Sequence, residues 1–283
     1  MRYASVLPSA LLLLVFGCTE PGGAPGATPG APARIVSMAP NLTEICFALG
    51  AGDRVVGVTE HCNHPEAAGA LPKVGGYNSP SLEAILGLEP DLVLCAEEGP
   101  LRAVVERLET LGISVWTVRI ATLADLFRAL DSIGKRVGAA RAAAALRGDL
   151  EARRDRVRDR VASKGRVPVV VVFDRAPLVV AGPGTFADDL IRLAGGTNVA
   201  ADATSAYPQL AMESLLAREP EVIVDLAAMG TNAGGAKEWW ARWEGLPAVR
   251  NGRVSVGDPD LLTRPGPRLL DGLEWLAGVL HPE

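Results

Sequence analysis

The chain is poor in the residues and motifs that most often carry catalysis or bind nucleic acid. Of its 283 residues only three are histidine, and the formal net charge is -5. A nucleic-acid-binding domain normally shows a basic stripe, so this composition argues against that class. The sequence has no C-x-x-C pair, no G-x-S-x-G elbow, no P-loop G-K-[ST], and no G-x-G-x-x-G after its first predicted strand. Zinc-ribbon, common hydrolase and nucleotide-binding functions therefore find no support.

Long hydrophobic runs are also absent, since no internal segment approaches the ~20 apolar residues that span a bilayer. An apolar run at Val6–Phe16 follows Arg2 and is typical of a signal-peptide core. It ends in "LVFGC", which resembles the lipobox of bacterial lipoproteins and predicts a lipidated Cys18. An ordinary signal peptide with an incidental cysteine is the alternative. Residues 19–33 are rich in Gly, Pro and Ala and predict a disordered tether.

Three cysteines remain after such cleavage, namely Cys46, Cys62 and Cys95. An odd number means that at least one thiol is free or paired outside the chain. Cys46 lies in an apolar helical pattern and Cys95 at the end of a predicted strand, as expected for small core residues. A disulfide between Cys46 and Cys95 is the alternative.

Two stretches of alternating strands and helices, residues 34–122 and 166–283, flank a helical middle at 123–165. Strands that alternate with helices favour parallel sheets. We therefore predict an α/β protein with an N-terminal lobe and a C-terminal lobe. In the middle, residues 139–163 predict one helix of about 24 residues, roughly 36 Å long, which would brace the lobes rather than hinge them.

Three local patterns sharpen this prediction. Asn41, with Glu44 three residues later, suggests a capping box at the start of the first helix. Ser79-Pro80 suggests that another helix begins there, because proline is tolerated at the first helical position. The pair Asp188-Asp189 suggests a solvated first turn of a helix rather than a catalytic pair of carboxylates.

A short unit occurs twice, once on each side of the long helix. "SLEAILGLEPDLVL" covers 81–94 and "AMESLLAREPEVIV" covers 211–224. Four of the fourteen positions are identical. They include a glutamate near the start of each unit, Glu83 and Glu213.

The segments "VSMAPNLTEICFALGAGDRVVGVT", "LPKVGGYNSPSLEAILGLEPDLVL", "YPQLAMESLLAREPEVIV" and "RPGPRLLDGL" stand in a particular order and spacing. In this arrangement the chain, from 34 to 280, resembles the periplasmic binding proteins that supply ABC importers with vitamin B12, haem or ferric siderophores. The resemblance implies two parallel-sheet lobes joined by one long helix, with a ligand cleft between them. It also implies that Glu83 and Glu213 dock onto arginines of the permease dimer. The alternative is that each glutamate merely complements its own helix dipole.

The resemblance places aromatic ligand contacts at Tyr77 and His61 in one lobe and at Tyr207 in the other. Tyr77 could instead be an ordinary loop residue over the core. His61 and His64 form H-x-x-H, which raises the possibility of a bare-metal site. A dedicated metal receptor would gather more His, Asp and Glu ligands from both lobes, so no metal site is predicted. His61 could still approach a ligand's metal axially.

The loop "DPDLLTRPGPR" adds Asp260 and Arg264 to the predicted ligand contacts. Arginine suits planar contacts to carboxylates or amide oxygens. Arg268 could be purely structural, at the start of the last helix. Leu261 departs from the best-studied B12 receptors, which carry a tryptophan there, so one aromatic wall is missing.

These features predict an exported, lipid-anchored, monomeric receptor of an ABC importer that faces the periplasm or the cell exterior. Its partners would be a permease dimer with its ATPase, a corrinoid ligand, and the membrane through the anchor. A ferric siderophore or haem is the alternative ligand. No cofactor, catalytic residue or nucleic-acid partner is predicted. A structural or adhesive lipoprotein is the competing class, but it would need neither a cleft nor two matched glutamates.

Overall fold

A computed structural model describes residues 30–97, 102–227 and 235–283. The predicted signal peptide at 1–17, Cys18 and most of the tether at 18–33 lie outside the described residues. No described helix has both the length and the apolar character that a membrane crossing requires.

The N-terminal lobe is built on a parallel four-stranded sheet in the order β2-β1-β5-β6. Val, Leu and Ile dominate these strands, as expected for a sheet that is covered on both faces. The strands are β1 Ile35–Ser37, β2 Val55–Val58, β5 Leu92–Ala96 and β6 Ser114–Val118. A small antiparallel hairpin pairs β3 Gly75–Gly76 with β4 Ser79–Pro80. The helices are α1 Pro40–Ala48, the 3-10 turn η1 Gly52–Arg54, α2 Glu66–Gly69, α3 Leu82–Gly87 and α4 Arg102–Thr110.

The C-terminal lobe repeats the plan with the sheet order β11-β10-β7-β8, and β9 pairs with β7. All of these pairings are parallel except that of β7 with β8. The strands are β7 Val167–Arg175, β8 Leu178–Val180, β9 Gly196–Asn198, β10 Val222–Asp225 and β11 Val254–Val256. The helices are α7 Phe186–Leu193, α8 Met212–Ala217, α9 Ala236–Ala241, α10 Pro247–Arg250, α11 Pro259–Thr263 and α12 Leu269–Leu280.

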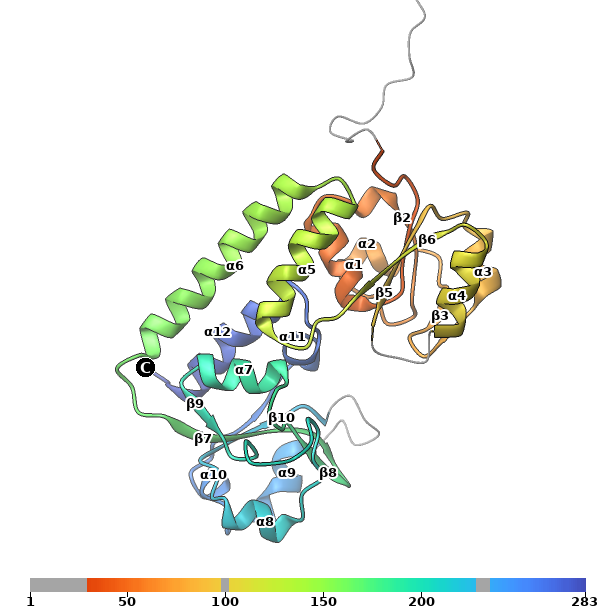
Figure 1. Cartoon of the computed structure of the whole chain (residues 1–283). Coiled ribbons are helices and arrows are strands. Elements are labelled where there is room, and N and C mark those ends of the chain that lie inside the picture. The colour runs from red at the N-terminus through yellow and green to blue at the C-terminus, as the bar shows by residue number, and fades with distance from the viewer. Residues whose placement is uncertain (1–29, 98–101, 228–234) are drawn as a thin grey trace, which may run out of the picture.

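Two helices connect the lobes, α5 Leu123–Arg136 and α6 Ala140–Val161. Figure 1 shows α6 running along one side of the molecule from one lobe to the other. Its 22 residues make it about 33 Å long at 1.5 Å per residue. Leu150 and Val157 are buried on its inner face, and Arg153 donates hydrogen bonds to Asp271 and Glu274 of α12. The predicted long helix between two parallel-sheet lobes is therefore confirmed.

The lobes share one apolar core. A single cluster of buried residues includes Ile35 of β1, Leu126 of α5, Leu150 of α6, Val169 of β7 and Leu273 of α12. Each sheet also has a smaller cluster of its own, which packs under α3 and α4 in one lobe and under α8, α9 and α10 in the other. Because the shared core is continuous, a large rotation of one lobe against the other would expose apolar surface.

The sequence repeat is also a structural repeat. Residues 81–90 and 211–220 show the same succession of exposed, half-buried and buried positions. Glu89 and Glu219 occupy corresponding left-handed turns, each with φ of 46°. Glu83 and Glu213 are both exposed in the first turns of α3 and α8. Figure 1 shows these two helices at the outer ends of the two lobes, on the far side of the molecule from α6.

Two predicted helix starts are wrong. Helix α1 begins at Pro40, with Ala39 at the N-cap and no side-chain cap, so Asn41 lies inside the first turn. Its Nδ2 instead donates toward the Pro265 carbonyl oxygen, 3.4 Å away. Ser79-Pro80 forms β4 rather than the start of a helix. Helix α3 begins two residues later, where the Ser81 side chain caps it by accepting a hydrogen bond from the Ala84 backbone N–H.

The acidic pair Asp188-Asp189 is largely shielded rather than solvated, with side chains 13% and 17% exposed. Asp188 accepts a hydrogen bond from Asn198, and Asp189 accepts one from the backbone N–H of Leu123. Asp189 thus ties α7 to the start of α5, a contact between distant segments that local pattern could not show.

The three cysteines of the described residues are all free and buried, so the possible Cys46–Cys95 bridge is not formed. Burial raises the pKa of both Cys46 and Cys95 to about 12. Cys62 lies against the hydroxyls of Thr43 and Thr59. Cys46 and Cys95 are therefore core residues, as their sequence context predicts, and Cys62 is buried as well.

Candidate functional site

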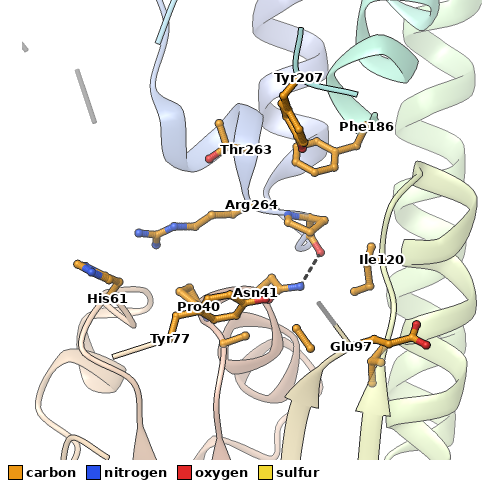
Figure 2. Close-up of a pocket in the computed structure, with 14 residues that line it drawn as sticks. Pro40, Asn41, His61, Tyr77, Glu97, Ile120, Phe186, Tyr207, Thr263 and Arg264 are labelled. Carbon is orange, nitrogen blue, oxygen red and sulfur yellow. Dashed lines mark hydrogen bonds between the residues drawn. The ribbon is translucent and has the colours of Figure 1, made fainter. Parts of the chain in front are cut away.

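A cleft of about 550 Å³ lies between the two lobes. Figure 2 shows residues of the N-terminal lobe on one side of it and residues of the C-terminal lobe on the other. The lining consists mainly of apolar and aromatic side chains with a few polar groups among them. This is the usual composition of a small-molecule site. The lining residues are Ala39, Pro40, Asn41, His61, Tyr77, Ala96, Glu97, Val118, Ile120, Phe186, Tyr207, Thr263, Arg264 and Pro265.

The parallel sheet of the N-terminal lobe explains how one wall is assembled. Pro40 follows β1, His61 follows β2, and Glu97 follows β5, while Val118 ends β6. Carboxyl ends of parallel strands meet at one edge of a sheet, and ligand sites form outside that edge. Tyr77 is added by the turn of the β3–β4 hairpin.

The wall of the C-terminal lobe carries aromatic rings. Phe186 opens α7, with Thr185 capping that helix through a hydrogen bond from the Asp188 backbone N–H. Tyr207 is 51% exposed and packs edge-on against Phe173, with ring centroids 5.3 Å apart. An exposed aromatic ring held in place by a second ring forms a rigid apolar surface for a ligand.

A charged cluster joins the lobes at one end of the cleft. Arg264 Nη2 lies 2.9 Å from Asp260 Oδ1, and Arg264 Nη1 donates to Asn63 Oδ1 at 2.6 Å. Glu44 Oε1 lies 3.8 Å from Arg264 Nη1. Glu44 is also bound by Arg268, and this hydrogen bond raises the pKa of the Arg268 guanidinium. Arg268 does not line the cleft, which fits the structural role considered for it.

The structure brings together four of the five predicted ligand contacts. Tyr77, His61, Tyr207 and Arg264 all line the cleft. Asp260 is not among the lining residues; its carboxylate pairs with Arg264 and accepts a hydrogen bond from the Asn63 side chain.

The sequence analysis did not name Glu97, Phe186, Asn41, Thr263 or Ile120 as ligand contacts, although all five line the cleft. A usable signal existed for Glu97, because it directly follows the buried strand "LVLCA" and so had to lie at the ligand edge of the sheet. Phe186 gave no comparable signal, because a phenylalanine at the first position of an amphipathic helix usually packs into the core.

The two histidines of H-x-x-H do not converge. His61 lines the cleft, whereas His64 lines a separate groove with Glu44 and Phe47. Among the residues that the structure describes, no group of three or more His, Cys, Asp or Glu side chains could hold a metal ion.

Two α/β lobes, a helical brace and an interlobe cleft define a receptor that encloses a solute between its domains. The chain belongs to the periplasmic binding protein family, which matches residues 35–261. It is thus an exported, periplasm-facing substrate-binding protein. The predicted family resemblance is confirmed.

Individual relatives agree with this assignment. The chain is 32% identical over 260 residues to an ABC transporter substrate-binding lipoprotein of Bacillus subtilis, with 89% of this chain and 81% of that one covered. The periplasmic vitamin B12-binding protein of Vibrio cholerae superposes with a TM-score of 0.78 at 28% identity, over 88% of this chain and 96% of that chain. A periplasmic haem-binding protein from Pseudomonas aeruginosa gives a TM-score of 0.78 at 31% identity, over 89% and 94%.

Proposed function

We propose that this protein is a lipoprotein that captures a corrinoid in the interlobe cleft and delivers it to the permease of an ABC importer. The observation that carries the proposal is the pair of tyrosines on opposite walls, Tyr77 and Tyr207, with Phe186 beside Tyr207 and Ile120 at one side of the cleft (Figure 2). Facing aromatic walls suit a flat macrocycle, because ring stacking adds roughly 0.5–1.5 kcal/mol beyond the burial of area. The vitamin B12-binding relatives support this ligand class.

Few polar groups would orient the ligand. His61 lies beside the Tyr77 wall, where its ring could contact the macrocycle or approach its metal from one face. Arg264 lies on the opposite wall, and its remaining N–H groups could reach an amide oxygen at the ring edge. Capture of the ligand involves no covalent step. Its affinity comes from apolar burial and a few placed hydrogen bonds.

Haem or a ferric siderophore is the second candidate ligand. Arg264 in the cleft wall favours it, because guanidinium groups bind carboxylates well. The similarity to a haem-binding protein points the same way.

Delivery of the ligand to the permease would use one exposed helix on each lobe, α3 and α8. Glu83 and Glu213, exposed on matching helices of the two lobes, are proposed to dock onto arginines of a two-fold symmetric permease. The proposal keeps the predicted signal peptide at 1–17, the lipidated Cys18 with a tether to 33, and a monomeric receptor that partners a permease and its ATPase. The lobes would begin at 34 and 166, with the helical region 123–165 between them.

A ligand titration tests the proposed function. A soluble fragment that begins at Ala33 would be titrated with cyanocobalamin, cobinamide, hemin and a ferric siderophore, followed by absorbance and by heat. We expect saturable binding of the corrinoids. Absence of corrinoid binding at high micromolar concentration, with saturable hemin or siderophore binding, would overturn the corrinoid proposal in favour of the second candidate.

A further inference from the structure

The positive charges at the Arg264 end of the cleft are already neutralised by neighbouring carboxylates. Arg264 has Asp260 at 2.9 Å and Glu44 at 3.8 Å, while Arg268 binds Glu44 from the other side. The side chains of these four residues are between 3% and 26% exposed, so water screens their mutual attraction only weakly. An anionic ligand that approached Arg264 would therefore also meet these two carboxylates.

The other end of the cleft carries a carboxylate without such compensation. Glu97 directly follows β5, is exposed, and lines the cleft. Figure 2 shows it at the opposite end of the cleft from His61 and Arg264. No ion pair to Glu97 is found among the described residues, and the segments 98–101 and 228–234 contain no Lys, Arg or His. Arg119, on the neighbouring strand end, is exposed and does not line the cleft.

The charges of the cleft are therefore unevenly distributed. Arg264 and Arg268 are balanced by the carboxylates of Glu44 and Asp260, whereas Glu97 at the opposite end lines the cleft without an ion-pair partner among the described residues. Without a compensating attraction at the other end, a ligand that carries carboxylates around its edge would experience repulsion at the end where Glu97 lies. A ligand that carries N–H donors would instead gain charge-assisted hydrogen bonds there.

We infer that Glu97 is a specificity-determining residue that selects uncharged or cationic ligands with N–H donors at their edge and disfavours ligands with carboxylates. This inference rests on the proposed function and narrows it. A corrinoid edge bears primary amides, which supply such donors without charge. The two polar arms of haem are both carboxylates, so they would meet Glu97 or the neutralised Arg264 without a free cation to bind.

Two ligands that share a ring and differ at the edge test the inference. Dicyanocobinamide carries amides and no net charge, whereas dicyanocobyrinic acid carries carboxylates on the same corrin ring. We expect the unaltered protein to bind the amide form more than tenfold more tightly. Glu97→Gln should reduce that preference by about five- to tenfold, as one unit charge acting over the length of a cleft would give. Glu97→Lys should reduce it further, and added salt should reduce it in the unaltered protein.

Glu109→Gln is the matched control, because Glu109 is exposed on α4 of the same lobe and does not line the cleft. It should leave the preference unchanged. If corrinoids bind but Glu97→Gln and Glu97→Lys leave the ratio unaltered, the role of Glu97 is overturned while the proposed function stands. If the unaltered protein binds no corrinoid, the proposed function fails, and the selection inferred here fails with it.

Discussion

Glu44 of the N-terminal lobe and Arg268 of the C-terminal lobe form a two-point ion pair between the lobes. Arg268 Nη2 donates to Glu44 Oε1 at 2.6 Å, and Arg268 Nε donates to Glu44 Oε2 at 3.0 Å. The side chains are 3% and 20% exposed, so the pair is largely shielded from water. It ties α1 directly to the start of α12 beside the cleft, in addition to the shared apolar core.

The substitution Glu44→Gln should destabilise the protein, because Arg268 would lose its carboxylate partner in a shielded site. Removing one partner of a buried pair typically costs about 3–5 kcal/mol, and partial exposure of Arg268 should place this loss nearer 2–3 kcal/mol. Urea unfolding of the soluble fragment measures the free energy of unfolding. Glu109→Gln is the control and should change it by less than about 0.5 kcal/mol. Equal midpoints for both variants would show that the pair contributes nothing.

The sequence shows the helix that carries Glu44 but not the residue that binds it. Glu44 and Arg268 are 224 positions apart, and nothing local distinguishes this glutamate from a capping residue. The strands, the long helix and the repeated unit were predictable, because each follows from periodicity, turn residues and internal similarity. Contacts between distant elements, such as Asp189 of α7 with the backbone of Leu123 in α5, depend on how the elements dock and so appear only in three dimensions.

The same distinction between local pattern and three-dimensional contact applies to the candidate site. Tyr77, His61, Tyr207 and Arg264 were predictable because they lie in loops that resemble those of known receptors, and all four reach the cleft. Asp260 lies in α11, four residues before Arg264, yet its side chain pairs with that arginine and does not line the cleft. The direction of a side chain depends on its partners, which loop sequence alone does not specify.

Tyr77→Ala should weaken corrinoid binding, because the substitution removes one of the two facing aromatic walls. The loss should be at least the stacking contribution of roughly 0.5–1.5 kcal/mol, a change in Kd of about two- to tenfold. Tyr77→Phe keeps the ring and should retain most of the affinity. Calorimetric titration of both variants with cyanocobalamin makes the comparison. Equal affinity of the Ala and Phe variants would place the ligand elsewhere.

Cys46 and Cys95 should be unreactive while the protein is folded. Both side chains are inaccessible, and burial raises both pKa values to about 12, so almost no thiolate forms at pH 8. Iodoacetamide labelling followed by peptide mass mapping should find neither residue modified in the native fragment. Without a reducing agent, both should be labelled fully in denaturant. Failure to label in denaturant would reveal a disulfide that the structure does not contain.

His281 should make the protein less stable as pH falls below about 6.5. Burial, together with the nearby positive charge of Lys164, lowers the pKa of His281 in the folded state. The unfolded chain therefore binds the proton first, and the free energy of unfolding decreases by at most about 1.4 kcal/mol per pH unit from this group. Urea unfolding between pH 7 and 5 should show a shallower decline for His281→Gln than for the unaltered protein. Parallel pH profiles would show that His281 protonates equally in both states.

The final prediction concerns docking through the exposed glutamates Glu83 and Glu213. If they dock the two lobes onto permease arginines, their role is intermolecular, and their exposure on α3 and α8, with neither lining the cleft, fits that role. Charge reversal of both to Lys should leave folding and corrinoid affinity nearly unchanged, because exposed substitutions usually cost within about 0.5 kcal/mol. Uptake by cells should fall sharply, since each attraction becomes a like-charge contact that costs several kcal/mol.

Each single reversal should give an intermediate loss of uptake, because the other lobe can still dock. Glu109→Lys, on the exposed face of α4, controls for the change in net charge and should transport normally. Normal uptake by the double variant would mean that the two glutamates serve only their own helix dipoles. The repeated unit would then reflect duplication of the lobes rather than selection for a two-point docking surface.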